Sequence, residues 1–74
     1  MLDRQLNAVL IVLNDFSDGA YKIIDADEII AKLSDSDRCT KVELSGIIRT
    51  LSDNDYIKVK YSTVDEYCLA TLAK

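Results

Sequence analysis

The sequence predicts a small α+β domain whose elements follow the order helix, strand, helix, helix, strand, strand. Three observations support that prediction: a helical repeat of apolar residues near the start, two capping boxes in the middle, and two alternating segments joined by a polar turn near the end. The chain has 74 residues, 49% of them apolar, which suits one domain with one small core. We therefore expect residues 1–74 to form a three-helix core and a small three-stranded antiparallel sheet.

The first helix is predicted over residues 2–16. Apolar residues recur there at helical spacing, namely Leu2, Leu6, Val9, Leu10, Leu13 and Phe16. Three further residues widen the apolar arc beyond one stripe: Ala8, Ile11 and Val12. Such a helix is usually buried on several sides, which leaves two interpretations open. Either these three residues form an interaction surface for dimerisation, or the helix is central and is buried within its own domain.

A short β-prone segment and a second helix follow. Gly19 suits a left-handed cap after the first helix. Residues 20–24 favour a strand, which needs a larger sheet to be stable. Asp25 and Glu28 form a capping-box pattern, in which the Asp25 side chain caps a second helix and Glu28 reaches back. We expect this second helix to end near residue 34.

The third helix and a hairpin account for the rest of the chain. Thr40 and Glu43 form a second capping box, which begins a helix over residues 40–52. The buried face of this helix is predicted to hold Leu44, Ile47, Ile48 and Leu51. Residues 56–61 and 66–72 then alternate as two strands around a polar turn. Ile57, Val59 and Tyr61 are predicted to point to one side of the first strand, and Tyr67, Leu69 and Thr71 to one side of the second. Of these residues, Ile57, Val59 and Leu69 are expected to share the core with the third helix.

Charge and composition exclude several classes of function. The net charge is −4, and residues 1–37 carry three basic against eight acidic side chains. Residues 38–60 carry five basic against three acidic side chains, so any contact with a phosphate backbone must come through this stretch. The chain has no histidine and two cysteines, too few ligands for a zinc site, so we expect two reduced thiols and no metal.

Neither catalysis nor membrane insertion is expected of this segment. No histidine base, glycine-rich phosphate loop or nucleophile elbow is present, so we expect no enzyme activity, cofactor or small-molecule substrate. The longest apolar run covers residues 8–13, far short of the roughly 20 residues that a membrane-spanning helix needs. The domain is therefore expected in the cytoplasm, alone or as the cytoplasmic part of a membrane-associated protein.

Residues 47–57 carry a resemblance to a known family. The sequence Ile-Ile-Arg-Thr-Leu-Ser-Asp-Asn-Asp-Tyr-Ile resembles the junction between the third helix and the wing in winged-helix domains. Residues 67–71 similarly resemble the returning wing strand, and the predicted order of elements fits. The chain is also similar to N-terminal winged-helix modules of clostridial proteins, some of which have membrane segments further along. The resemblance implies a winged-helix fold and DNA binding of the transcription-regulator type, with residues 40–52 as the recognition helix.

The resemblance and the helical spacing together select candidate DNA-binding residues. The outward face of the third helix presents Lys41, Ser45, Arg49 and Ser52, and the wing adds Lys58 and Lys60. Arg49 is suited to bidentate pairing with a guanine edge. The alternative is that these are ordinary solvated residues. Gly46, within the same helix, either permits close approach of another surface or marks tight packing inside the domain.

Two hypotheses of different classes follow from these observations. The first is a module that binds double-stranded DNA. The second is an acidic module that binds itself or another protein and no nucleic acid. The chain departs from DNA-binding family members because its third helix is poor in basic residues and its wing tip carries Asp65 and Glu66. A contiguous positive surface over Lys41, Arg49 and Lys60 favours the first hypothesis, and its interruption by carboxylates favours the second.

Overall fold

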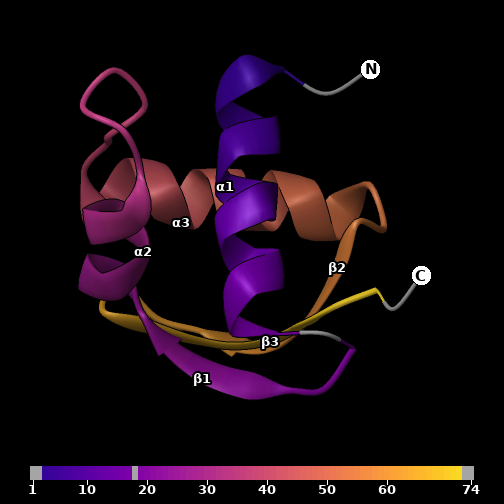
Figure 1. The fold of residues 1–74 in the computed structure, drawn as a ribbon. Coiled ribbons are helices and arrows are strands. Elements are labelled where there is room, and N and C mark those ends of the chain that lie inside the picture. Colours follow the sequence, from indigo (N-terminus) through magenta and orange to yellow (C-terminus); the bar gives the residue numbers. More distant parts are fainter. Residues whose placement is uncertain (1–2, 18, 73–74) are drawn as a thin grey trace.

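The elements occur in the predicted order. The computed structural model describes residues 3–17 and 19–72. Its elements are α1 (Arg4–Phe16), β1 (Lys22–Asp25), α2 (Ala26–Lys32), α3 (Lys41–Asp53), β2 (Ile57–Ser62) and β3 (Glu66–Thr71). The three helices lie on one side of the sheet (Figure 1). The α+β arrangement is therefore confirmed, while the predicted helix start at Leu2 lies outside the described residues.

Strand β3 is the centre of the sheet. The strand order is β1-β3-β2, and both neighbours pair with β3 in antiparallel fashion. The alternation predicted for residues 66–72 is only partly correct, because Cys68 and Ala70 are buried as well as the inward residues Tyr67 and Leu69. A central strand with small outward side chains is shielded by the larger residues of its neighbours.

A β-bulge in β2 overturns one predicted orientation. Val59 is opposite Leu69, but Tyr61 is opposite the very next residue of β3, Cys68, so Lys60 is an extra residue without a partner. An extra residue shifts the alternation beyond it to the other face. Tyr61 therefore lies on the outer face of the sheet, 41% exposed, and the prediction that it points to the same side as Ile57 is wrong.

One core serves the helices and the hairpin. Leu44, Ile47, Ile48 and Leu51 of α3 are buried together with Ile57 and Leu69 of the hairpin, as predicted, whereas Val59 is half-buried. Helix α1 contributes Val9, Val12 and Leu13 to the same core. The turn after α1 contains Gly19 with a φ angle of 84°, the left-handed conformation predicted from the sequence.

The two predicted capping boxes have different outcomes. The Thr40 side chain accepts a hydrogen bond from the Glu43 backbone N–H, and the Glu43 carboxylate accepts one from the Thr40 N–H, so this capping box is confirmed. The prediction for Asp25 is wrong, because its side chain makes no cap hydrogen bond. Asp25 is also the last residue of β1, and its strand pairing constrains it. The Ala26 N–H instead donates to the Asp65 backbone carbonyl at 2.8 Å, which anchors α2 to the hairpin tip.

Candidate functional site

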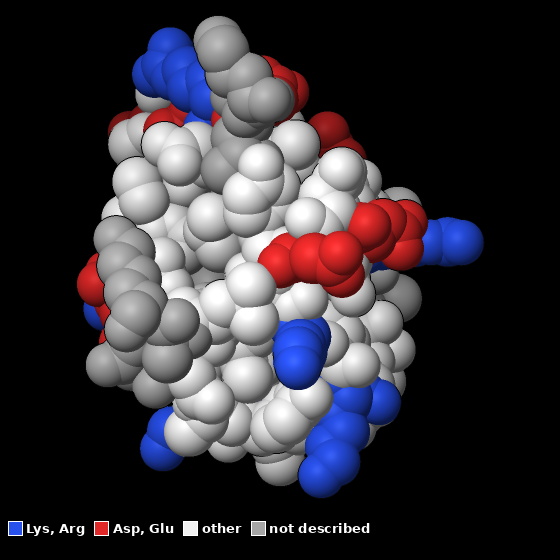
Figure 2. All heavy atoms as spheres, turned by 90° about the vertical axis from the view of Figure 1, so that its right-hand side faces the viewer, with Lys and Arg blue, Asp and Glu red and all other residues white. Residues whose placement is uncertain are grey.

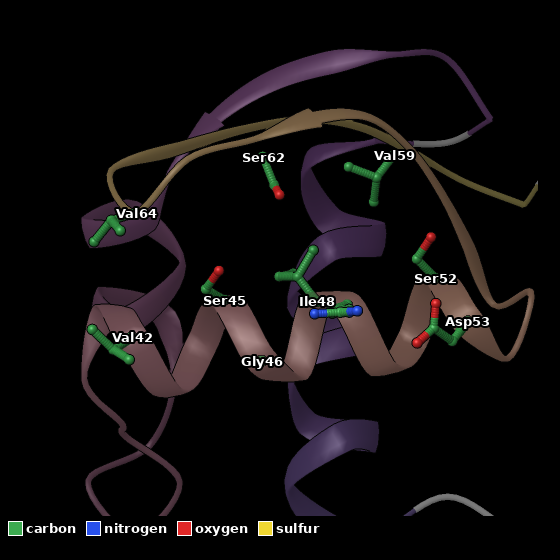
Figure 3. Close-up of a pocket in the computed structure, with 10 residues that line it drawn as sticks. Val42, Ser45, Gly46, Ile48, Ser52, Asp53, Val59, Ser62 and Val64 are labelled. Carbon is green, nitrogen blue, oxygen red and sulfur yellow. The ribbon is translucent and has the colours of Figure 1, made fainter.

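A groove lies between the outward face of α3 and the hairpin formed by β2 and β3. We call it the α3–hairpin groove; its volume is about 550 Å³. Figure 3 shows side chains from both elements pointing toward one another across it. The lining consists of Val42, Ser45, Gly46, Ile48, Arg49, Ser52, Asp53, Val59, Ser62 and Val64. The sequence therefore identified one wall of this groove, through Ser45, Arg49 and Ser52.

The groove has an apolar end and a charged end. Val42 of α3 and Val64 of the hairpin tip lie at the same end in Figure 3, and Asp53 lies at the other. Val42 is 71% exposed, and Val64 is also exposed. Arg49 and Asp53 are one helical turn apart and supply the charge of this lining. The groove therefore offers an exposed apolar contact beside one cation and one anion.

Lys41 does not contribute a free positive charge to this surface. Its ammonium nitrogen lies 3.1 Å from Asp65 Oδ1 and 3.5 Å from Asp27 Oδ2. The hydrogen bond to Asp65, followed by attraction to Asp27, raises the pKa of the Lys41 ammonium group. These contacts join the start of α3 to α2 and to the hairpin tip. Lys41 thus braces three segments, and two carboxylates offset its charge.

Lys58 and Lys60 lie away from the groove. Lys58 is opposite Ala70 in the sheet, so both side chains project from the outer face. The Lys60 ammonium nitrogen lies 5.3 Å from the centre of the Tyr21 ring, a cation–π arrangement across the sheet. Figure 2 shows basic side chains as separate groups on a largely uncharged surface, with acidic side chains among them. The six candidate DNA-binding residues are therefore not brought together.

The candidate surface on α1 is also divided. Val12 is only 6% exposed and belongs to the core, while Ala8 is half-buried against that core. Ile11 is 56% exposed. The structure therefore excludes Val12 from a dimerisation surface, because this side chain is buried within its own domain, and leaves Ile11 exposed.

Gly46 lies on the exposed side of α3. Apart from its chain neighbours and the backbone of its own helix, a Cβ atom placed there would meet no heavy atom of the described residues within 4 Å. The prediction of tight packing inside the domain is therefore wrong. The interpretation that remains is the other one, in which the exposed backbone at Gly46 permits close approach of a second surface.

Two features of this site escaped the sequence analysis. Val64 completes the apolar end of the groove, and the signal for it in the sequence is a single valine inside an otherwise polar turn. The Tyr67 hydroxyl is buried and has no hydrogen-bond partner among the described residues. Burial raises the pKa of the Tyr67 phenol, and the nearby Ser45 hydroxyl partly opposes that rise. Ser45 therefore connects the groove lining to a buried polar atom.

Other kinds of site find little support within residues 3–17 and 19–72. Cys39 is half-buried and Cys68 is buried, and both are free thiols. Burial, followed by the charge of Glu43, raises the pKa of the Cys39 thiol. No group of three or more potential metal ligands occurs in this part of the chain, and none of its helices is both long and apolar enough to cross a membrane.

Comparison with known proteins adds no assignment to this geometry. No protein-family model matches the chain, and no curated protein sequence matches it.

Proposed function

We propose that this domain is a protein-interaction module that receives a short segment of a partner protein in the α3–hairpin groove. The observation that carries the proposal is the lining, in which three valines and three serines surround a single cation and a single anion. Exposed apolar side chains that gather on one surface are typical of protein-binding sites. Val42, at 71% exposure, is the most solvent-exposed of the large apolar residues in the described part of the chain.

Electrostatics favour a protein over a nucleic acid as the partner. Binding to a phosphate backbone requires several basic residues on one surface. Here Lys41 is held by Asp27 and Asp65, and Asp53 lies in the groove with Arg49. The net charge of −4 adds a general repulsion of phosphates. The carboxylates thus interrupt the positive surface that DNA binding would need.

The groove also defines what the partner segment should contain. We expect an apolar side chain of the segment to pack against Val42 and Val64 at this end of the groove, and its burial is favourable by about 25 cal/mol per Å² of apolar area. The missing side chain at Gly46 lets the backbone of the segment approach α3 closely. Arg49 forms no ion pair with the described residues, so it is free to bind a carboxylate. The segment should therefore combine apolar residues with an acidic one.

The decisive experiment selects peptides and then locates where they bind. A random peptide library displayed on phage is panned against the full chain, and the selected peptides are titrated while backbone amide chemical shifts are recorded. We expect apolar–acidic peptides that shift residues of α3 and the hairpin tip. Val42→Asp should weaken binding about tenfold or more, because it places a carboxylate in the apolar contact.

A matched control keeps this experiment interpretable. Ile11→Asp makes the same kind of change at an exposed apolar residue of α1, and it should leave peptide affinity unchanged. Equal losses in the two variants, or chemical-shift changes confined to residues outside the groove, would contradict the proposal.

DNA binding of the transcription-regulator type is a second candidate function. The observation that favours it is Arg49, which is exposed on the outward face of α3 and has no ion pair within the described residues. Labelled duplex DNA should then bind at low salt, and Arg49→Ala should cost about 1–3 kcal/mol on a specific site. Absence of any affinity at low salt would remove this candidate.

We place the module in the cytoplasm and assign it no catalytic step. Two free thiols in the described residues are the state expected in a reducing compartment.

A further inference from the structure

The outer face of the sheet is apolar at its middle, and none of the helices within residues 3–17 and 19–72 covers it. All three helices lie on the opposite side (Figure 1). Ile23 of β1 is 64% exposed, and Cys68 of β3 lies between it and Tyr61 of β2. Directly opposed residues of antiparallel strands share a face, so these three side chains form one row across the sheet. We call this row the outer apolar row.

Opposite charges lie at the two ends of this face. Asp25 is opposite Glu66 on one side of the outer apolar row. On the other side, Lys58 is opposite Ala70, and Lys60 extends over Tyr21. Partial burial raises the pKa of the Tyr61 phenol, and so do the charges of Glu66 and Cys68, which is consistent with these side chains sharing the outer face. The distance from Glu66 to Ala70 along β3 is about 13 Å, four residues at about 3.3 Å each.

We propose that the outer sheet face binds a second copy of this chain to form a symmetric dimer. The arrangement has a twofold axis that lies in the interface, runs perpendicular to the strands and passes through the outer apolar row. This rotation places the row of one copy on the row of the other. It also places the Asp25–Glu66 end of each copy over the Lys58–Lys60 end of its partner.

Charge complementarity is the reason for choosing a second copy as the occupant. A symmetric interface requires a surface that is complementary to itself. A face with one acidic end, one basic end and an apolar middle meets that condition, because the twofold rotation exchanges the two ends. A face of uniform charge would instead repel its own copy. The α3–hairpin groove lies on another surface, so dimerisation leaves it open.

The size of the chain sets the expected affinity. The molecule measures 27 × 27 × 20 Å, so one face offers less than the roughly 800 Å² per partner of a standard interface. We therefore expect a reversible dimer with a dissociation constant in the micromolar range, and we expect it to weaken as salt concentration rises.

The test is sedimentation equilibrium of the full chain and of charge-reversal variants, each checked for folding by circular dichroism. Lys58→Glu and Glu66→Lys should each be monomeric at concentrations where the unmodified chain is a dimer, with the dissociation constant raised about tenfold or more by like-charge contacts. An equimolar mixture of the two variants should form a heterodimer, because one copy then has an acidic face and the other a basic face. The double variant K58E/E66K should dimerise with itself.

Two control variants distinguish this interface from the other surfaces of the molecule. Lys22→Glu makes the same charge change in β1, but Lys22 is opposite the inward residue Leu69, so it should not affect the dimer. Ile11→Asp tests α1 in the same way. A chain that stays monomeric at about 1 mM, far above a micromolar dissociation constant, would overturn the proposal. So would failure of the two charge-reversal variants to associate on mixing, or loss of the dimer in Ile11→Asp.

Discussion

The two faces of the sheet differ in what they contact, although the same three strands form both. On the inner face, Ile24, Tyr67 and Leu69 lie against the helices and are fully buried. On the outer face, Ile23 and Tyr61 are apolar but exposed. Residue type alone therefore does not determine burial, because burial depends on which elements the connections place over each face. An apolar face without such cover is a surface available for binding.

The largest expected loss of stability comes from truncating an apolar side chain on the inner face of the sheet, and the same kind of truncation on the outer face is its comparison. Leu69→Ala leaves a cavity in the core and should lower the free energy of unfolding by about 2–5 kcal/mol. Ile23→Ala removes a similar side chain from a 64% exposed position and should cost less than about 1 kcal/mol. Urea denaturation at low micromolar protein concentration measures both. Equal losses would show that the outer face is covered within the folded monomer.

A smaller loss of stability is expected from removing the Thr71 hydroxyl at the end of β3. The Thr71 hydroxyl donates a 2.6 Å hydrogen bond to the Ser17 backbone carbonyl, and both residues are buried. Thr71→Val keeps the shape and leaves that carbonyl without its partner, which should lower the free energy of unfolding by about 1–3 kcal/mol. Thr50→Val is the control, because the exposed Thr50 hydroxyl also donates to one backbone carbonyl, that of Gly46 at 3.0 Å. A loss at position 71 no larger than that of the control would mean that water replaces the bond.

Local sequence patterns predicted the elements well and the contacts between them less well. The helical spacing of Leu44, Ile47 and Leu51 identified the buried face of α3, since that pattern depends only on neighbours in the chain. The β-bulge at Lys60 escaped prediction because an alternating segment looks the same with or without an extra unpaired residue. The Asp25 cap failed for a similar reason, because strand pairing, which sequence does not show, competes with capping.

The candidate site was predictable on one wall only. Helical periodicity placed Ser45, Arg49 and Ser52 outward, and all three line the α3–hairpin groove. The offset of the Lys41 charge was not predictable, because its partners Asp27 and Asp65 lie 14 and 24 residues away in sequence. Only the fold brings a hairpin tip and a second helix to the start of α3.

Helix α3, like the sheet, has one face buried in the core and one face exposed to solvent. A substitution at Gly46 tests the exposed face. Gly46→Ala adds a methyl group where, apart from its chain neighbours and the backbone of its own helix, no heavy atom of the described residues lies within 4 Å. Alanine is favoured over glycine inside a helix by roughly 0.5–1 kcal/mol, so the variant should be more stable by about that amount. Thermal denaturation measures the gain. The same methyl group intrudes on the α3–hairpin groove, so the variant should also bind peptides more weakly. If the variant were instead less stable, the space beside Gly46 would be occupied by other side chains in solution.

The smallest effect at neutral pH is expected for Tyr67→Phe on the inner face. The variant keeps the ring and removes a buried hydroxyl that has no hydrogen-bond partner among the described residues, so the free energy of unfolding should change by less than about 1 kcal/mol.

Burial raises the pKa of the phenol in the folded state, which means that folding favours its neutral form. That contribution to stability is complete below the pKa of the unfolded chain, about 10, and is lost as pH rises through the folded pKa. Urea denaturation at pH 7 and pH 11 should therefore show the unmodified chain losing more stability than Tyr67→Phe. A loss above about 1 kcal/mol in Tyr67→Phe at pH 7 would instead indicate a hydrogen bond to the hydroxyl in solution. Ser45→Ala would then test whether Ser45 is that partner, because the Ser45 hydroxyl is the side chain that opposes the rise in the pKa of the Tyr67 phenol.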